Sequence, residues 1–158
     1  MPKEFSGDAQ VSNAARFAII VSKYNRNITD NLQKAAVETL LKAGVADEQI
    51  EIFWVPGAWE ISFMADLLAR RSVYSAIICL GAVIRGETTH DQHINRQVSL
   101  GLGQIAIKYQ VPVPFGLLTC NTLEQAIHRS GGNVGNKGEE CAEAALEMVS
   151  LLARIPFD

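Results

Sequence analysis

Four short apolar runs alternate along the chain with longer stretches in which apolar residues recur at helical spacing. The runs are typical of buried strands and cover residues 16–22, 50–55, 76–80 and 112–120. The helical stretches begin near Thr29 or Asp30, near Ile61, at His90, after Thr122 and after Asn136. Strands that alternate with helices predict an α/β fold, in which a four-stranded parallel sheet has helices on both faces.

Residues suited to capping mark several helix ends. Gly44 follows the last apolar position of the first helix, where a left-handed conformation commonly ends a helix. Thr122 with Gln125, and Asn136 with Glu139, fit capping boxes, in which an N-cap side chain and a residue three positions later satisfy free N–H groups. These pairs place the starts of the last two helices.

The helix predicted over residues 90–109 has more apolar residues than one face can hold. The stripe at helical spacing comprises Ile94, Val98, Leu102, Ile105 and Tyr109. Leu100 and Ile107 fall off this stripe. We therefore expect a second apolar face that meets a neighbouring subunit.

The chain is expected to form one domain, residues 16–158, behind an N-terminal tail, residues 1–15. The tail is small and polar. We expect it to become ordered against a partner surface. It would pair with the edge of a neighbouring subunit's sheet and so cover an otherwise exposed strand.

Composition narrows the classes of function. The hydrophobic share of 48% and the mean hydropathy of +0.10 are high for a small monomer and favour a homo-oligomer. A formal net charge of −3 without a basic run argues against a nucleic-acid partner. No apolar run is long enough to span a bilayer, and the first residues lack the apolar core of a signal peptide. We therefore expect no membrane partner and a cytoplasmic location.

Parallel sheets of this kind bind ligands at the carboxyl ends of their strands. In this chain these ends are residues 22–25, 55–60, 81–90 and 119–121. Aromatic, acidic and histidine residues gather at the first three. The sequence therefore predicts a ligand site at this edge of the sheet.

Residues 81–93 carry the strongest candidate chemistry. A buried strand passes into glycine-containing backbone, then the hydroxyl groups of Thr88 and Thr89, and then His90, which opens a helix. A helix start offers unpaired N–H groups and partial positive charge to an anion, and an imidazole transfers protons near neutral pH. The alternative is an ordinary strand-to-helix turn capped by Thr88 or Thr89. His93, one turn further on, competes with His90 for the catalytic role.

Two other site types are not supported by the motifs. His90 and His93 could form a metal pair, but no third ligand stands at a metal-site spacing, so we expect no metal. Residues 131–138 resemble a phosphate-binding Walker loop, but Gly-Lys is not followed by Ser or Thr, and the segment joins two helices. A flexible interhelical loop is favoured there, in which Lys137 and Arg129 could still supply charge to an anion.

Two aromatic residues lie at predicted strand ends. Tyr24 and Trp59 could belong to the core or to an interface, or they could stack on a flat heteroaromatic ligand. The three cysteines, Cys79, Cys120 and Cys141, are far apart and include no Cys-x-x-Cys, which is typical of a reducing compartment. We expect all three to serve in packing.

Four segments stand in a fixed order: W-V-P-G-A-W-E at 54–60, G-A-V-I-R-G-E-T-T-H at 81–90, E-Q-A-I at 124–127 and G-N-K-G at 135–138. Together they closely resemble the motifs of lumazine synthase, the 6,7-dimethyl-8-ribityllumazine synthase of riboflavin biosynthesis. The resemblance extends from about residue 17 to residue 152. It implies a flavodoxin-like three-layer αβα fold around the four-stranded parallel sheet.

The resemblance implies an enzyme, a transferase that uses no cofactor and no metal. The family condenses 5-amino-6-(D-ribitylamino)uracil with 3,4-dihydroxy-2-butanone 4-phosphate to 6,7-dimethyl-8-ribityllumazine, releasing phosphate and water. The 5-amino group forms an imine with the ketone, phosphate is eliminated, and the ribitylamino nitrogen closes the ring. The alternative is a catalytically weak paralogue that binds flavin or lumazine as a shell or storage protein. The retained His90, Arg129 and Thr88 favour the enzyme.

The resemblance also implies roles for single residues. The ribitylaminouracil would be bound by Tyr24, Ala58, Trp59, Glu60, Ala82, Val83, Ile84 and Phe115. The butanone phosphate would be bound by Glu87, Thr88 and Arg129, with Lys137 as an accessory group. His90 would be the proton donor. Phe115 matches an aromatic residue that reaches the site of an adjacent subunit, so activity would require assembly.

Three positions differ from the commoner choices of the family. Tyr24 stands for Phe or Trp, and Trp59 stands for Phe or Tyr, so both rings remain aromatic and able to stack. Glu87 stands where a small residue is often found. Because a carboxylate would repel a phosphate, we expect Glu87 to contribute its backbone N–H while its side chain turns away.

The resemblance finally implies a quaternary structure. The family assembles as pentamers, and in many members twelve pentamers close into an icosahedral capsid of sixty subunits. The segment of residues 130–137 carries no apparent insertion, which favours such a shell over a pentamer or decamer. The resemblance also allows an association with riboflavin synthase.

Overall fold

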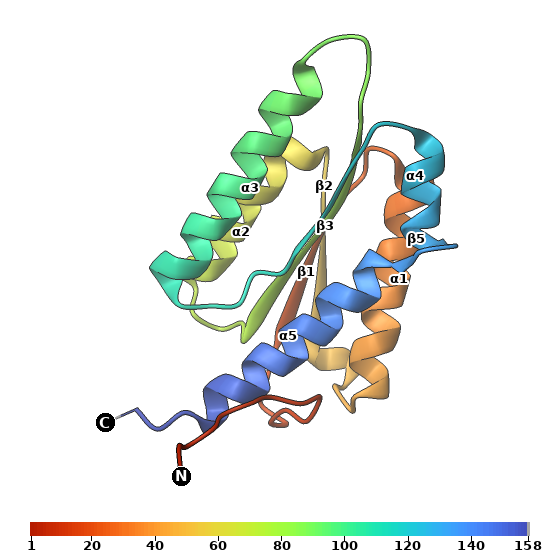
Figure 1. Cartoon of the computed structure of the whole chain (residues 1–158). Coiled ribbons are helices and arrows are strands. Elements are labelled where there is room, and N and C mark those ends of the chain that lie inside the picture. Colours follow the sequence, from red (N-terminus) through yellow and green to blue (C-terminus); the bar gives the residue numbers. More distant parts are fainter. Residues whose placement is uncertain (158) are drawn as a thin grey trace.

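The computed structural model describes residues 1–157 and consists of one parallel sheet between two layers of helices (Figure 1). The four strands are β1 (Phe17–Ser22), β2 (Ile50–Val55), β3 (Ala76–Ile84) and β4 (Phe115–Cys120). They lie in the order β2-β1-β3-β4, and every neighbouring pair is parallel. The predicted fold class, a three-layer α/β arrangement with a four-stranded parallel sheet, is confirmed.

Helices cover both faces of this sheet. One face is covered by α1 (Arg26–Lys42) and α5 (Lys137–Arg154), and the other by α2 (Ile61–Arg70) and α3 (His90–Tyr109) (Figure 1). Shorter elements are the helix α4 (Leu123–His128), the 3₁₀ turns η1 (Asp47–Gln49) and η2 (Ala58–Glu60), and the strands β5 (Ser130–Gly132) and β6 (Gly135–Asn136).

The central strand β1 is buried on both of its faces. Phe17, Ile19 and Val21 belong to the core cluster under α1 and α5. Ala18 and Ile20 alternate with them and belong to the cluster under α2 and α3. All six residues of β1 are therefore buried, which explains why its sequence is a continuous apolar run instead of an alternating one.

Two predicted strand boundaries were wrong. β3 continues through Ile84, where it pairs with Cys120 at the end of β4, so the strand carries the first part of the 81–93 motif. β4 begins only at Phe115, because the two prolines before it can accept hydrogen bonds from β3 but cannot donate any. The carbonyl groups of Pro112 and Pro114 accept hydrogen bonds from Ile77 and Cys79 at 2.9 and 3.2 Å, whereas proline has no N–H to continue the ladder.

The start of α1 was also predicted wrongly. The helix begins at Arg26, and Thr29 is buried within it. The N-cap is Asn25, whose φ of 61° is left-handed, a conformation that Asn tolerates better than most residues. Its side chain donates to the carbonyl of Ala82 at 2.9 Å, a contact between distant segments that no local pattern signals.

Other predicted helix ends are confirmed. Gly44 has a φ of 94° just beyond α1. The Thr122 hydroxyl accepts from the Gln125 N–H at 3.2 Å, and the Asn136 side chain accepts from the Gly138 N–H at 2.8 Å. In the first capping box, the side chain of Gln125 does not bond to the N–H of the N-cap residue Thr122. It accepts instead from the N–H of the preceding residue, Asn121, at 2.7 Å.

Most of residues 131–138, for which we predicted a flexible loop, belong instead to a small antiparallel hairpin of β5 and β6. The hairpin packs closely against α4. A Cβ atom at Gly132 would lie 2.8 Å from the carbonyl oxygen of Ile127, so only glycine fits there without a shift. The hairpin therefore holds the start of α5 against the end of α4.

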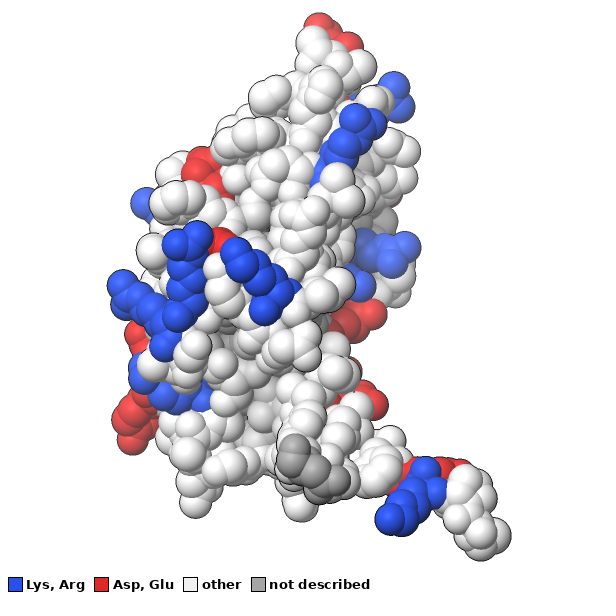
Figure 2. Space-filling model, turned by 90° about the vertical axis from the view of Figure 1, so that its left-hand side faces the viewer, with Lys and Arg blue, Asp and Glu red and all other residues white. Residues whose placement is uncertain are grey.

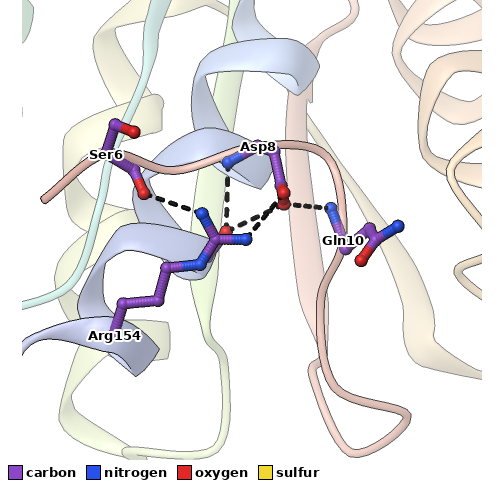
Figure 3. A network of polar contacts seen from close by, with 5 residues as sticks. Ser6, Asp8, Gln10 and Arg154 are labelled. Carbon is purple, nitrogen blue, oxygen red and sulfur yellow. Dashed lines mark hydrogen bonds and ion pairs between the residues drawn. The ribbon is translucent and has the colours of Figure 1, made fainter.

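The N-terminal segment contains no helix or strand and lies along α5 (Figure 3). Asp8 accepts from Arg154 at 2.6 Å and from the Gln10 N–H at 2.8 Å, and its own N–H donates to Ser150 at 3.1 Å. Arg154 also donates to the Ser6 carbonyl at 2.8 Å. These contacts join the two ends of the chain. The expected pairing of residues 1–15 with a neighbouring sheet stays a prediction.

The outer face of α2 and α3 bears several exposed apolar side chains. Leu100 and Ile107 are 59% and 75% exposed, and Phe63 on α2 is 75% exposed. Most residues on this face are uncharged, and Lys and Arg side chains occur in several places, with a group at the middle left of the view (Figure 2). The second apolar face of α3 is confirmed, and its contact with another subunit stays a prediction. Among residues 1–157, no helix has the length and apolar character needed to cross a membrane.

Candidate active site

A cleft of about 550 Å³ opens at the carboxyl ends of β1, β2 and β3 and reaches the first turn of α3. We refer to it as the strand-end cleft. The structure brings together there these predicted site residues: Tyr24, Ala58, Trp59, Glu60, Ala82, Val83, Ile84, Thr88 and His90. Gly86, Asp91 and Ile94, which were not predicted, also line it. The predicted position of the ligand site at this edge thus coincides with a real concavity.

Two exposed aromatic rings mark the cleft. Tyr24 is 73% exposed and Trp59 is 54% exposed, so neither belongs to the core, which was one of the alternatives for them. Backbone contacts fix the loop of Tyr24 to the end of β2, because Lys23 and Tyr24 donate to the carbonyls of Val55 and Pro56 at 2.8 and 3.2 Å. A flat ligand between such rings would bury apolar area that water now contacts.

The turn η2 is held from the side of α3. Gln97 donates from its side-chain nitrogen to the carbonyl of Trp59 at 2.9 Å and accepts from the hydroxyl of Ser62. Within the turn, the Glu60 N–H donates to the carbonyl of Gly57 at 3.2 Å. The position of Trp59 and Glu60 is therefore set by α3 as well as by β2.

The end of β3 forms the floor of the cleft. Ala82 and Val83 are only 2% and 9% exposed, so it is mainly their backbone that a ligand could reach. The Asn25 side chain holds the Ala82 carbonyl, and the Arg85 N–H donates to the carbonyl of Cys120 at 2.8 Å. The strand end is thus rigid on both sides, as a surface that binds a planar ring through backbone groups would need to be.

His90 is the first residue of α3 and is exposed in the cleft. Its backbone N–H donates to the hydroxyl of Thr88 at 3.3 Å, whereas Thr89, the N-cap residue, makes no side-chain cap bond. His93 does not line the cleft. The geometry therefore favours His90 over His93, and it places an imidazole beside a helix start that can attract an anion.

Glu87 is exposed, but it does not line the cleft, although Gly86 and Thr88 on either side of it do. A residue whose neighbours face the cleft while its own side chain does not can offer only backbone groups to a ligand. This arrangement accords with the backbone role expected for Glu87, which stays a prediction.

Phe115, Arg129 and Lys137 lie elsewhere, in a second concavity of about 510 Å³ along β4 and α4. We refer to it as the basic recess. Phe115 is 40% exposed at the start of β4, and Arg129 is the residue that ends α4. The hairpin contact from the Lys137 N–H to the Arg129 carbonyl, 2.9 Å long, keeps the two basic residues together. Within one chain these three residues do not meet the strand-end cleft.

The two concavities differ in charge. Among residues 1–157, the cleft is lined by the carboxylates of Glu60 and Asp91 and by no Lys or Arg. The recess is lined by Arg129 and Lys137 and by no Asp or Glu in the same range. An anionic ligand in the cleft of a single chain would therefore lack a strong counter-charge, apart from the helix start of α3.

The cysteine thiols are held in their neutral form. Burial raises the pKa of Cys141 to about 11, and burial also raises the pKa of Cys79. Cys120 lines the recess, and burial raises its pKa while nearby Arg129 opposes the rise. The packing role is confirmed for Cys79 and Cys141, which are buried in the two core clusters. No group of three potential metal-ligating side chains occurs in the described part of the chain.

Comparison with known proteins matches residues 14–153 to the family model of 6,7-dimethyl-8-ribityllumazine synthase. The chain is 49% identical over 142 residues to the 6,7-dimethyl-8-ribityllumazine synthase of Rhodopirellula baltica, which covers 90% of this chain and 92% of the relative. It is 47% identical over 140 residues to that of Coxiella burnetii, covering 89% of this chain and 93% of the relative. The chain belongs to the 6,7-dimethyl-8-ribityllumazine synthase family.

Proposed function

We propose that the strand-end cleft is where this enzyme condenses 5-amino-6-(D-ribitylamino)uracil with 3,4-dihydroxy-2-butanone 4-phosphate. The product is 6,7-dimethyl-8-ribityllumazine, and the enzyme acts in riboflavin biosynthesis. One observation carries the assignment of the site: two exposed aromatic rings, the backbone end of β3 and His90 surround a single cleft in a chain of this family.

The ribitylaminouracil binds between the aromatic residues and the end of β3. Tyr24 and Trp59 offer ring faces to the planar pyrimidine, and the backbone of residues 82–84 offers hydrogen-bonding groups to its edge. Glu60 accepts hydrogen bonds from the ribityl hydroxyls, since a carboxylate is an acceptor. Ala58, the buried first residue of η2, has a small side chain that lets the ring approach the backbone.

The phosphate of the second substrate binds at the start of α3. Thr88 offers a hydroxyl, the backbone around Glu87 offers N–H groups, and the helix start adds partial positive charge. The carboxylates of the cleft oppose this binding, so a cation must come from outside the cleft. Arg129 is the counter-charge and Lys137 an accessory one, both supplied from the basic recess of a neighbouring subunit.

The reaction proceeds by addition, elimination and ring closure. The 5-amino nitrogen attacks the ketone, and loss of water leaves an imine. The carbon next to the imine then loses a proton, the phosphate group leaves the adjoining carbon with its bonding electron pair, and His90 gives a proton to the departing oxygen. The enol left by the elimination becomes a ketone, and the ribitylamino nitrogen finally attacks this ketone and closes the ring with loss of a second water. Because no strong nucleophile is required, holding the two substrates together in reactive geometry supplies much of the rate increase.

The active unit is an assembly in which the cleft of one subunit faces the recess of the next. Phe115 then covers the pyrimidine of its neighbour, and the exposed face of α2 and α3 becomes subunit interface. Pentamers, and a capsid of twelve pentamers, are the assemblies we propose. Residues 1–15 act as an arm outside the domain of residues 16–158. A cytoplasmic location fits the three free cysteines.

The decisive experiment is to incubate the purified protein with both substrates and to follow lumazine absorbance. We expect product well above the uncatalysed background, which is measured in parallel without protein. Tight riboflavin binding with no product above that background would overturn the enzyme and leave a flavin-binding shell protein.

A further inference from the structure

Helix α3 turns one face toward the core, and Asp91 stands at the start of that face. Val98, Leu102 and Ile105 are buried on it, and Ile94 packs against the same cluster. Asp91 precedes Val98 by two helical turns and therefore lies on the same side. An acidic residue at an inward position breaks the apolar stripe where the helix meets the strand-end cleft. Such local violations are commonly found at functional sites.

The carboxylate of Asp91 has unused hydrogen-bonding capacity. The residue lines the cleft, and its Oδ1 atom is buried without a hydrogen-bond partner among residues 1–157. A buried oxygen without a donor is costly, so a rotation of the carboxylate that brings this oxygen to a ligand donor in the cleft would be favourable. An ionised carboxylate is an acceptor only. Asp91 is thus fitted to a ligand with O–H or N–H groups.

The charge of the cleft selects between the two substrates. Asp91 and Glu60 are both negative, and no basic side chain from residues 1–157 lines the same cleft. Two carboxylates repel a phosphate and favour a neutral molecule rich in donors. The ribitylaminouracil, with its ribityl hydroxyls, ring N–H groups and amino group, is such a molecule, whereas the butanone phosphate is not.

We propose that Asp91 is a further substrate-binding residue, whose carboxylate accepts a hydrogen bond from the ribitylaminouracil and does not bind the butanone phosphate. This assignment rests on the proposed function of the cleft. Asp91 is also the acidic residue of the first turn of α3, where it stabilises the helix start in any case. If Asp91 had only this structural role, its substitution would change the thermal stability of the protein and would not affect the KM values of the two substrates differently.

The test measures each substrate's KM in the assembled enzyme with Asp91→Asn and Asp91→Ala. Asp91→Asn keeps the shape and removes the charge, and Asp91→Ala removes the acceptor. We expect the KM for the ribitylaminouracil to rise about tenfold in Asp91→Ala and less in Asp91→Asn, because bonds to charged acceptors are about twice as strong as neutral ones. The KM for the butanone phosphate should stay unchanged or fall, since a repelling charge is gone.

Asp47→Asn is the matched control, because Asp47 is an exposed carboxylate at the opposite end of the sheet. It should change neither KM. Binding of the lumazine product, followed by its fluorescence, should weaken in Asp91→Ala in parallel with the KM for the uracil.

An Asp91→Ala enzyme with an unchanged KM for the uracil and unchanged product binding would overturn the proposal. A rise in both KM values together with a lower melting temperature would assign Asp91 to helix stability, which also overturns it. Failure of the proposed function itself is distinguishable, because the wild-type protein would then form no lumazine.

Discussion

The strand-end cleft and the basic recess have similar volumes, about 550 and 510 Å³, but opposite chemistry. The cleft has the aromatic rings, the imidazole and two carboxylates, whereas the recess has two basic side chains and Phe115. A reaction between a planar donor-rich molecule and a phosphate ester needs both sets. Under the proposed function, one chain therefore holds two complementary halves, and the sheet order explains why they stay apart: the cleft is built on β1, β2 and β3, and the recess on the edge strand β4.

The largest effect is expected when the cleft is disabled on one chain and the recess on another. Trp59→Ala/His90→Ala disables the cleft, and Phe115→Ala/Arg129→Ala disables the recess. Each enzyme alone should lose activity by about a hundredfold or more, since each loses binding and catalytic terms together. If the two chains are co-expressed and assemble at random, roughly a quarter of the shared sites combine an intact cleft with an intact recess. Lumazine formation by the mixed assembly should recover to about that fraction.

The outcome of the mixing decides whether the halves belong to one site. As the control, two differently tagged copies of the same double variant are co-expressed in the same way. No recovery in mixed assemblies of normal size would mean that each chain works alone. A monomer in light scattering at micromolar concentration would contradict the shared site without any kinetics.

The recess should act on one substrate only. Arg129→Ala removes the proposed counter-charge of the phosphate, and a lost hydrogen bond to a charged group should raise the KM for the butanone phosphate by about a hundredfold. The KM for the uracil should change little. Arg71→Ala, which removes an exposed arginine at the end of α2, is the matched control and should be neutral. Equal changes in both KM values would remove Arg129 from phosphate binding.

The sequence predicts the position of a site residue only where the local pattern of apolar and polar residues determines that position. Tyr24, Trp59 and His90 lie at strand ends that the alternating pattern identifies, so the position of the cleft followed from the sequence. The separation of Arg129 from Thr88 did not follow, because the position of β4 beside β3 is a long-range pairing that no local pattern encodes. Their roles as binding partners came from family resemblance.

Two further misses have the same physical origin. Asn25 ends the first loop in a left-handed conformation supported by a contact with Ala82, far along the chain. β3 extends through Ile84 because β4 pairs with it there. The local sequence does not indicate this, because Gly81 already interrupts the apolar run and Arg85 follows Ile84. Asp91 is different, since its inward position could have been found by continuing the apolar stripe of α3 backwards by two turns.

Within the cleft, the two histidines of the motif should differ. His90→Ala should lower kcat about tenfold to a hundredfold, because general acid catalysis contributes modestly and the uncatalysed condensation competes. His93→Ala is the matched control one turn further on, exposed and outside the cleft, and it should leave kcat near the wild-type value. The measurement is the initial rate at saturating concentrations of both substrates. A fully active His90→Ala enzyme would remove His90 from proton transfer.

The smallest effect is expected in the recess, at Cys120. This thiol lies among basic side chains, an arrangement that could activate a nucleophile, but burial raises its pKa, and this effect outweighs the opposing influence of Arg129. A raised thiol pKa means that the neutral form persists at pH values where a free cysteine begins to ionise, so reaction with iodoacetamide at pH 8 should be slower than that of a model thiol. Cys120→Ser should accordingly leave kcat and both KM values within about twofold, as expected for a substitution that removes no functional interaction. A hundredfold loss would show that the recess supplies a nucleophile, and the division of labour between a reactive cleft and a charge-supplying recess would have to be abandoned.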